Sequence, residues 1–253
     1  MYYFGDYKRL LKFSLGEKMK FIKWIWRLVV VGLIFISLSL TLTSPVELKV
    51  DSTADLVKSS INKVVDQANN SDLQMGVAFL QESGIEDTLL SQLPKNIELK
   101  TSYQGLNQLS TNYLANGKLA ASDLKLNNDT QQEQVFNQLI LQLVNEQLRQ
   151  NSADVKQAAE IYHLIYFLLI GLYILAMVMV LFGKKIAILP LLIAAVGSYG
   201  VLSYAAEIAT SSLQQSVYTG INVSLSSGLS QALITAIIAV VGCLFIRIKQ
   251  NKE

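Results

Sequence analysis

The sequence has only one cysteine, Cys243, and one histidine, His163, in its 253 residues. A single cysteine excludes a disulfide within the chain, and one residue of each kind is too few for a zinc site of histidine and cysteine ligands. Charged residues are also scarce at 16%, whereas apolar residues make up 51% and the mean hydropathy is +0.36. This balance is too apolar for an ordinary soluble domain and indicates a membrane protein.

The common catalytic motifs are missing as well. There is no glycine-rich phosphate loop, no H-E-x-x-H and no G-x-S-x-G. The carboxylates Glu82, Glu86, Asp87 and Glu98 offer the residue type needed for acid–base hydrolysis, but solvated helices bring carboxylates together by chance. We therefore predict a protein that is not an enzyme, with no catalytic residues, no cofactor and no metal site.

Apolar residues gather in four blocks, at 24–43, 161–183, 186–206 and 229–246. Each block is long enough to cross the bilayer core of roughly 30 Å as a helix. In lipid, the backbone of a single segment can satisfy its own polar groups only as a helix. The predicted fold class is an all-α integral membrane protein with four transmembrane helices and a mainly helical domain between the first two.

Basic residues predict the orientation of these spans. The first 27 residues, residues 184–185 and the tail 247–253 together carry twelve basic and three acidic residues, whereas the region 44–160 carries nine basic and fifteen acidic ones. Because lysine and arginine favour the cytoplasmic side, the segment 1–23 and the tail are predicted to be cytoplasmic. The domain 44–160 and the loop 207–228, which has no lysine or arginine, are then extracytoplasmic.

The first block has a second interpretation, as a cleavable signal peptide with a cleavage region at Ser37–Ser44. Its apolar run is longer than that of a usual signal peptide, and no A-x-A-like site follows it. We therefore expect an uncleaved anchor. Translation starting at Met1 or at Met19 remains open, because residues 1–18 also resemble a basic, aromatic helix lying on the membrane surface.

The region 44–160 has the composition of solvated helices. A helix over 130–149 is predicted by a capping box, Thr130 with Glu133, and by one apolar stripe. That stripe consists of Phe136, Leu139, Ile140, Leu143, Val144 and Leu148. A second helix is predicted over 51–69, and the segment from Asp154 is expected to continue into the second span after a break at Asn151–Ser152.

Two short segments, VELKV at 46–50 and IELKT at 97–101, are near copies that alternate apolar and charged residues. Such alternation is typical of a half-buried strand, so a small two-strand pairing is possible. The segment 105–126 is predicted to be a helix broken at Asn116–Gly117. The segment 211–228 is expected to be a short surface helix or a loop.

Polar and small residues in the spans suggest packing more than chemistry. His163 and Glu207 have types suited to a proton-binding pair, but both lie at outer span ends, where contact with headgroups and water explains them. Cys243 is expected to be a small apolar filler. Small residues in the last two spans let helices approach closely, within the chain or between copies. They are Ala194, Gly197, Ser198, Gly200, Ala232, Ala236, Ala239 and Gly242.

We expect a non-enzymatic, multi-pass protein of a bacterial plasma membrane, of Gram-positive type, whose extracytoplasmic domain binds or supports another envelope or secretion component. Its expected partners are the bilayer and that protein, with a second copy as a further option, but not nucleic acid. The first alternative is a subunit of a transporter or permease that acts as an oligomer or with a separate ATPase, with a polar path lined by Ser198, Tyr199, Ser203 and Tyr204. The second is a sensor whose output domain lies on another protein, because the segments predicted inside are too short to hold one.

Overall fold

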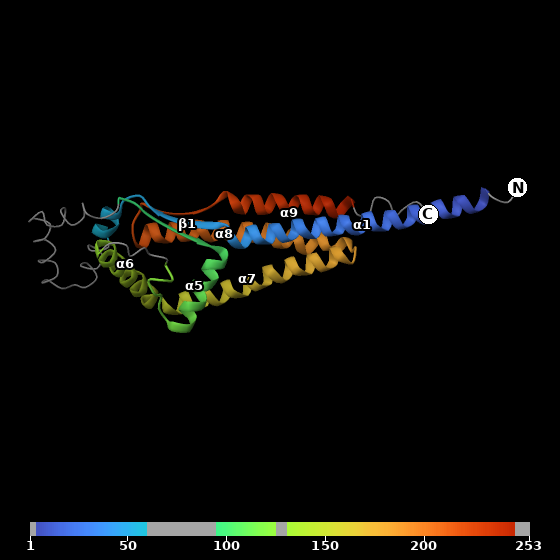
Figure 1. Ribbon diagram of the computed structural model, residues 1–253. Coiled ribbons are helices and arrows are strands. Elements are labelled where there is room, and N and C mark those ends of the chain that lie inside the picture. The colour runs from blue at the N-terminus through green and yellow to red at the C-terminus, as the bar shows by residue number, and fades with distance from the viewer. Residues whose placement is uncertain (1–3, 60–94, 125–130, 246–253) are drawn as a thin grey trace, which may run out of the picture. The chain divides into compact units, whose positions relative to one another are not determined.

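The structure is a computed structural model that describes residues 4–59, 95–124 and 131–245, and these are mostly helical (Figure 1). The helices are α1 (Phe4–Thr43), α5 (Tyr103–Asn116), α6 (Gln131–Gln150), α7 (Ser152–Leu181), the 3-10 turn η1 (Lys185–Ala187), α8 (Ile188–Ser216) and α9 (Ser227–Phe245). The strands are β1 (Pro45–Val50), β2 (Ile97–Ser102) and β3 (Ile221–Leu225).

Four helical stretches are long and apolar enough to span a membrane. They are Phe21–Thr43, Ser152–Leu181, Lys185–Ser216 and Ser227–Phe245. Each coincides with one of the apolar blocks in the sequence, so the prediction of four spanning helices is confirmed to that extent. Large apolar side chains such as Phe35, Leu164 and Ile238 stay exposed on these helices, and lipid accepts this surface where water would not. The chain is a multi-pass membrane protein.

Two of these helices extend beyond the predicted apolar blocks. α7 begins at Ser152, so the predicted continuation into the second span is confirmed, as is the break after α6. α8 continues past residue 206 to Ser216. Hydroxyl groups in this extension bond back to carbonyl oxygens one turn earlier, Thr210 to Ala206 at 2.8 Å and Ser216 to Ser212 at 2.7 Å. Polar residues therefore continue the helix where the apolar pattern has ended.

The chain forms two compact units. One, the helical unit, comprises residues 1–42, 167–200 and 227–253; the other, the sheet unit, comprises residues 43–166 and 201–226. In the helical unit the fully buried side chains come from all four long helices. They include Val30, Ile34, Tyr173, Ala176, Leu191, Ala194, Ala236 and Ala239. Small residues are frequent in this core because close packing of backbones drives helix association in lipid.

Gly242 marks the close approach of α9 to α1. The indole Nε1 of Trp26 donates a 3.0 Å hydrogen bond to the Gly242 carbonyl oxygen. A Cβ atom at this position would lie 2.9 Å from Cγ2 of Val30, whereas one at Gly197 of α8 would meet nothing within 4 Å. At this position, the small-residue face of α9 therefore packs against a helix of the same chain. The sequence alone leaves open whether such faces pack within the chain or between copies.

Gly183 lies just beyond the end of α7 and has a positive φ of 67°. The Lys184 amide donates to the Met179 carbonyl at 2.9 Å and the Gly183 amide to Val180 at 2.9 Å, the bonding of a glycine-capped helix end. Arg27 of α1 adds a hydrogen bond of 3.2 Å from Nη1 to the Leu181 carbonyl. A cation at the carboxyl end of a helix also compensates the helix dipole.

The sheet unit contains a three-stranded antiparallel sheet in the order β2-β1-β3. Leu48 of β1 lies opposite Leu99 of β2 and Val223 of β3. The pairing of β1 with β2 confirms the possible pairing of the two near-copy segments. β3 was not predicted, because this segment was expected to be a surface helix or a loop. The predicted all-α class is therefore corrected to a mostly helical protein with one small sheet.

Alternation along each strand gives the sheet an apolar face. Val50, Leu56 and Ile221 form its buried core. Partly buried residues pack around them, namely Leu48, Ile97, Val144, Leu213, Val217 and Tyr218. Val144 comes from the predicted stripe of α6, so part of that stripe faces the sheet unit's core. The predicted 51–69 helix is helical over 53–59, not at residues 51–52, and its residues 60–69, like Thr130, lie outside the described residues.

Side chains fix both ends of α5. The Ser102 hydroxyl accepts a 3.0 Å hydrogen bond from the Gly105 amide at the start, and Gly117, with φ 67°, ends the helix at the predicted break. Asn145 of α6 holds the chain just beyond it. Its side-chain amide donates to the Leu119 carbonyl at 2.9 Å, and its oxygen accepts from the Leu119 amide at 2.8 Å.

Because Gly242 is tightly packed and Gly197 is not, we expect alanine to lower the stability of the protein at the first position but not at the second. Gly242→Ala should lower the stability of the helical unit by about 1–3 kcal/mol, because the added methyl group overpacks the α1–α9 contact at Val30. Gly197→Ala is the matched control and should leave stability unchanged or slightly higher. Thermal unfolding of both variants in detergent measures the difference. Equal unfolding midpoints for the two variants would contradict the packing described here.

Candidate interaction surface

β1 and β2 share the order glutamate, leucine, lysine, at 47–49 and 98–100. Successive side chains of a strand point to opposite faces, so each leucine points to one face while its charged neighbours point to the other. The antiparallel register then places Glu47 opposite Lys100 and Lys49 opposite Glu98. Opposite charges in directly facing positions stabilise a strand pair and disfavour other registers.

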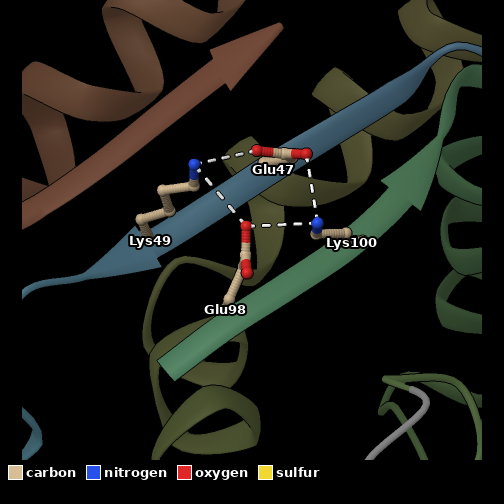
Figure 2. A network of polar contacts seen from close by, with 4 residues as sticks. All are labelled: Glu47, Lys49, Glu98 and Lys100. Atoms are coloured by element: carbon tan, nitrogen blue, oxygen red, sulfur yellow. Dashed lines mark ion pairs between the residues drawn. The ribbon is translucent and has the colours of Figure 1, made fainter. Parts of the chain in front are cut away.

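Figure 2 shows these four residues as a closed ring of ion pairs. Lys49 Nζ lies 3.0 Å from Glu47 Oε2 and 3.5 Å from Glu98 Oε1. Lys100 Nζ lies 3.4 Å from Glu47 Oε1 and 3.3 Å from Glu98 Oε1. Exposed pairs such as these contribute little stability individually. Together, the two glutamates and two lysines give this face of the sheet no net charge but a fixed order of charges.

The ring shifts the pKa values of Glu47, Lys49 and Lys100. The hydrogen bond from Lys49 is the largest influence on Glu47 and lowers its pKa below the usual 4.5, although burial acts in the opposite direction. The bond to Glu47 raises the pKa of Lys49, and the bond to Glu98 raises that of Lys100. Glu47, Lys49 and Lys100 are therefore charged at neutral pH, and their ion pairs are maintained.

The two outer edges of the sheet differ. The amide of Val223 in β3 donates to Thr210 Oγ1 at 2.9 Å, and the Val223 carbonyl lies 3.3 Å from the same hydroxyl. Gln214 Nε2 donates to the Ile221 carbonyl at 2.8 Å. Thr210 and Gln214 lie one turn apart on α8. The outer edge of β3 is therefore sealed by side chains of the neighbouring helix.

The hydrogen-bonding pattern of β1 shows which backbone groups of β2 point away from the sheet. Backbone bonds from Asp51 to Gly220 and from Ser226 to Pro45, both 3.1 Å, show that the odd-numbered residues of β1 bond to β3. Because bonding alternates along an antiparallel strand, the even-numbered residues of β1 bond to β2. Their partners in β2 are the odd-numbered residues, so the backbone groups of Glu98 and Lys100 point outward. Across residues 4–59, 95–124 and 131–245, no group caps them.

A cluster of three tyrosines joins α5 to the start of α7. The Tyr103 ring lies 5.2 Å from the Tyr162 ring and 5.3 Å from the Tyr166 ring, between centroids. The Tyr162 hydroxyl donates to the Tyr103 carbonyl at 2.7 Å. Burial, and to a lesser extent Tyr166, raise the pKa of Tyr103 to about 12. Tyr103 therefore stays neutral and serves as a packing residue within the described part of the sheet unit.

A second polar cluster lies in the core of the helical unit. Ser37 Oγ donates to the Ala232 carbonyl at 2.8 Å, which links α1 to α9. Thr41 Oγ1 donates to the Ser37 carbonyl at 2.9 Å, and the Tyr173 hydroxyl lies 3.2 Å from Ser37 Oγ. Each of the three hydroxyl hydrogens has an acceptor, so the cluster is satisfied. Its geometry suits holding helices together in lipid, where such bonds contribute about 1 kcal/mol each.

Sequence reasoning did not select Ser37, Thr41 or Tyr173, because it searched the spans for ionisable groups. The residues it selected for a polar path do not gather on one face of α8. Ser198 is 1% exposed and donates to the Ala195 carbonyl at 3.0 Å, whereas Tyr204 is 67% exposed. Tyr199 is 37% exposed and Ser203 half-buried. This arrangement does not favour a path lined by these residues within a single chain.

His163 lies beside α5, with Nε2 3.0 Å from Thr111 Oγ1. Glu207 is exposed on α8, and its carbonyl accepts a 3.1 Å hydrogen bond from Ser211. Cys243 is buried in α9 as a free thiol. Of the four carboxylates considered for hydrolysis, Glu98 belongs to the charged ring, and Glu82, Glu86 and Asp87 lie outside the described residues. Within the described ranges, no three His, Cys, Asp or Glu residues gather as metal ligands.

Comparison with other proteins adds no assignment. No protein-family description, curated protein or solved structure matches this chain. Within the described part of the chain, the sheet has one edge sealed by α8 and one edge, that of β2, without a capping group beside the charged ring.

The ring predicts how Glu47 titrates. Its pKa should lie below 4.5 and return toward that value in the Lys49→Met, Lys100→Met double variant, which keeps the aliphatic stems but removes the charges. Because the pKa is lowered in the fold, the ring stabilises the protein above the usual pKa, and this contribution is lost as the pH falls through the lowered value. Carboxyl-carbon NMR titration in detergent measures both proteins. Identical pKa values would contradict the ion pairs.

Proposed function

We propose that the chain is a non-enzymatic, multi-pass protein of a bacterial plasma membrane, of Gram-positive type, whose extracytoplasmic sheet unit binds or supports another envelope or secretion component. The observation that carries this proposal is the sheet itself. β1 follows the first spanning helix, and β3 lies between the third and the fourth. Strands of one sheet must lie on the same side of a bilayer, so the two segments predicted to be outside share one compartment.

Charge supports the side chosen. The regions 1–27, 184–185 and 247–253 hold most of the lysine and arginine, which favours a cytoplasmic location for them. The β2 edge, which no group of the described ranges caps, supports the binding role. Proteins generally protect strand edges, because unpaired backbone groups recruit another chain. Here α8 seals the β3 edge, whereas the β2 edge presents its backbone groups and charges.

Cysteine labelling tests the orientation. In a Cys243→Ala background, Lys118→Cys in the sheet unit should react with a membrane-impermeant maleimide in intact cells. Lys184→Cys, between the second and the third spans, should react only after lysis. Both positions are exposed in the structure, so accessibility within the protein does not separate them. Reaction at residue 184 but not 118 in intact cells would reverse the proposed topology.

Photo-crosslinking tests the binding role. A photoreactive amino acid at Asn222 or Glu160, both exposed in the sheet unit, should trap a distinct protein in intact cells at native expression. The same amino acid at Leu244, an exposed position of α9, should give lipid adducts or none and serves as the control. The absence of any protein adduct at both sheet-unit positions would speak against a partner-binding role.

A further inference from the structure

We propose that the outer edge of β2 binds an extended segment of a partner protein as an added antiparallel strand, and that this segment carries glutamate and lysine in the order Glu-x-Lys. The inference rests on the proposed partner-binding function and names its site and the chemistry of the partner. Two observations carry it, the outward backbone groups at Glu98 and Lys100 and the charge order that β1 already presents to the opposite edge of β2.

β1 shows what β2 accepts. Its segment Glu47-Leu48-Lys49 pairs with Lys100, Leu99 and Glu98 respectively, so both charged positions face an opposite charge. An antiparallel strand on the other edge, centred on Leu99, meets the same two side chains in the same order. Its glutamate then faces Lys100 and its lysine faces Glu98. The reverse order, Lys-x-Glu, would put like charges directly opposite each other, which destabilises a strand pair.

The charged ring leaves capacity for these contacts. Glu98 uses the same oxygen, Oε1, for both of its ion pairs, so Oε2 remains outside the ring. Lys100 has three donor hydrogens and two carboxylate partners in the ring. Both side chains are about half exposed, at 44% and 56%. An added strand can therefore extend the ring sideways without breaking it.

The backbone register is equally defined. In a strand centred on Leu99, the residues facing Glu98 and Lys100 form the hydrogen-bonded pairs, and the residue facing Leu99 forms a non-hydrogen-bonded pair. Such pairs bring Cα atoms to about 4.5 Å, which lies within the range that a disulfide spans. A cysteine at position 99 is therefore a direct probe of this register.

A second copy also carries the order Glu-x-Lys in its own β2. Its pairing would give a disulfide-linked dimer of the Leu99→Cys protein without any peptide, so the experiment below separates it from the proposed partner, a different polypeptide.

Disulfide trapping tests the proposal on the full chain in detergent. The protein carries Cys243→Ala and Leu99→Cys. The probe is a peptide with the sequence of residues 45–50 in which cysteine replaces the leucine, PVECKV, with both ends blocked. The control peptide, PVKCEV, has the same composition with the two charges exchanged. Under thiol-exchange conditions, the first peptide should form the mixed disulfide in about tenfold greater yield at equal concentration, as read by mass spectrometry.

A variant of the edge provides the second arm. Glu98→Pro removes an outward amide hydrogen and leaves the β1 side of the ladder intact, because proline is tolerated where the amide faces away from the sheet. It should abolish trapping of PVECKV. Glu98→Ala keeps the amide and should reduce trapping only in part. Unchanged β1–β2 protection in hydrogen exchange verifies that the proline variant is folded.

Three positive trapping or crosslinking results would overturn the inference. They are equal trapping of both peptides, trapping that survives Glu98→Pro, and spontaneous disulfide-linked dimerisation of the Leu99→Cys protein without peptide, which would identify a second copy as the occupant. Failure of trapping together with retained photo-crosslinks at Asn222 or Glu160 would reject the β2 edge but leave the partner-binding function standing. Loss of both would reject the proposed function itself.

Discussion

The hydrogen bonds between β1 and β3 are the constraint on which the sheet unit depends. They join residues 45–50, just after the first spanning helix, to residues 221–225, just before the last one. The pairing therefore holds together two segments that lie far apart in the sequence, with α7 and α8 between them.

The backbone groups at the two edges of the sheet are covered unequally, and this difference can determine where another strand pairs. On the β3 side, Thr210 and Gln214 of α8 occupy the backbone groups that another strand would use. On the β2 side, the charged ring gives an approaching strand a preferred order of charges. A sealed edge avoids unspecific pairing, and an ordered charge pattern at the open edge discriminates among sequences. Both edges depend on β1, because its pairing determines which backbone groups of β2 and β3 point outward.

Composition and alternation were enough to predict the four spanning helices, the break after Gln150 and the pairing of the two near-copy segments. They were not enough for β3, because a five-residue strand among serines and threonines resembles a loop until a partner strand is known. Ser37, Thr41 and Tyr173 were missed because neutral hydroxyl groups have no distinctive sequence pattern. Which backbone groups of β2 point outward depends on which ones β1 uses, and that pattern exists only once the strands have paired.

The central position of β1 also has a consequence for biosynthesis. Val46 pairs with Leu225, so the strand made first in the sheet finds its last neighbour only after α7 and α8 have been synthesised and inserted. Contacts between residues so distant in sequence form slowly, and unpaired strand edges invite aggregation in the meantime. β1 and β2 can pair earlier, because both precede α7 in the chain. Until β3 has been made, β1 carries an unpaired edge that the finished sheet does not have.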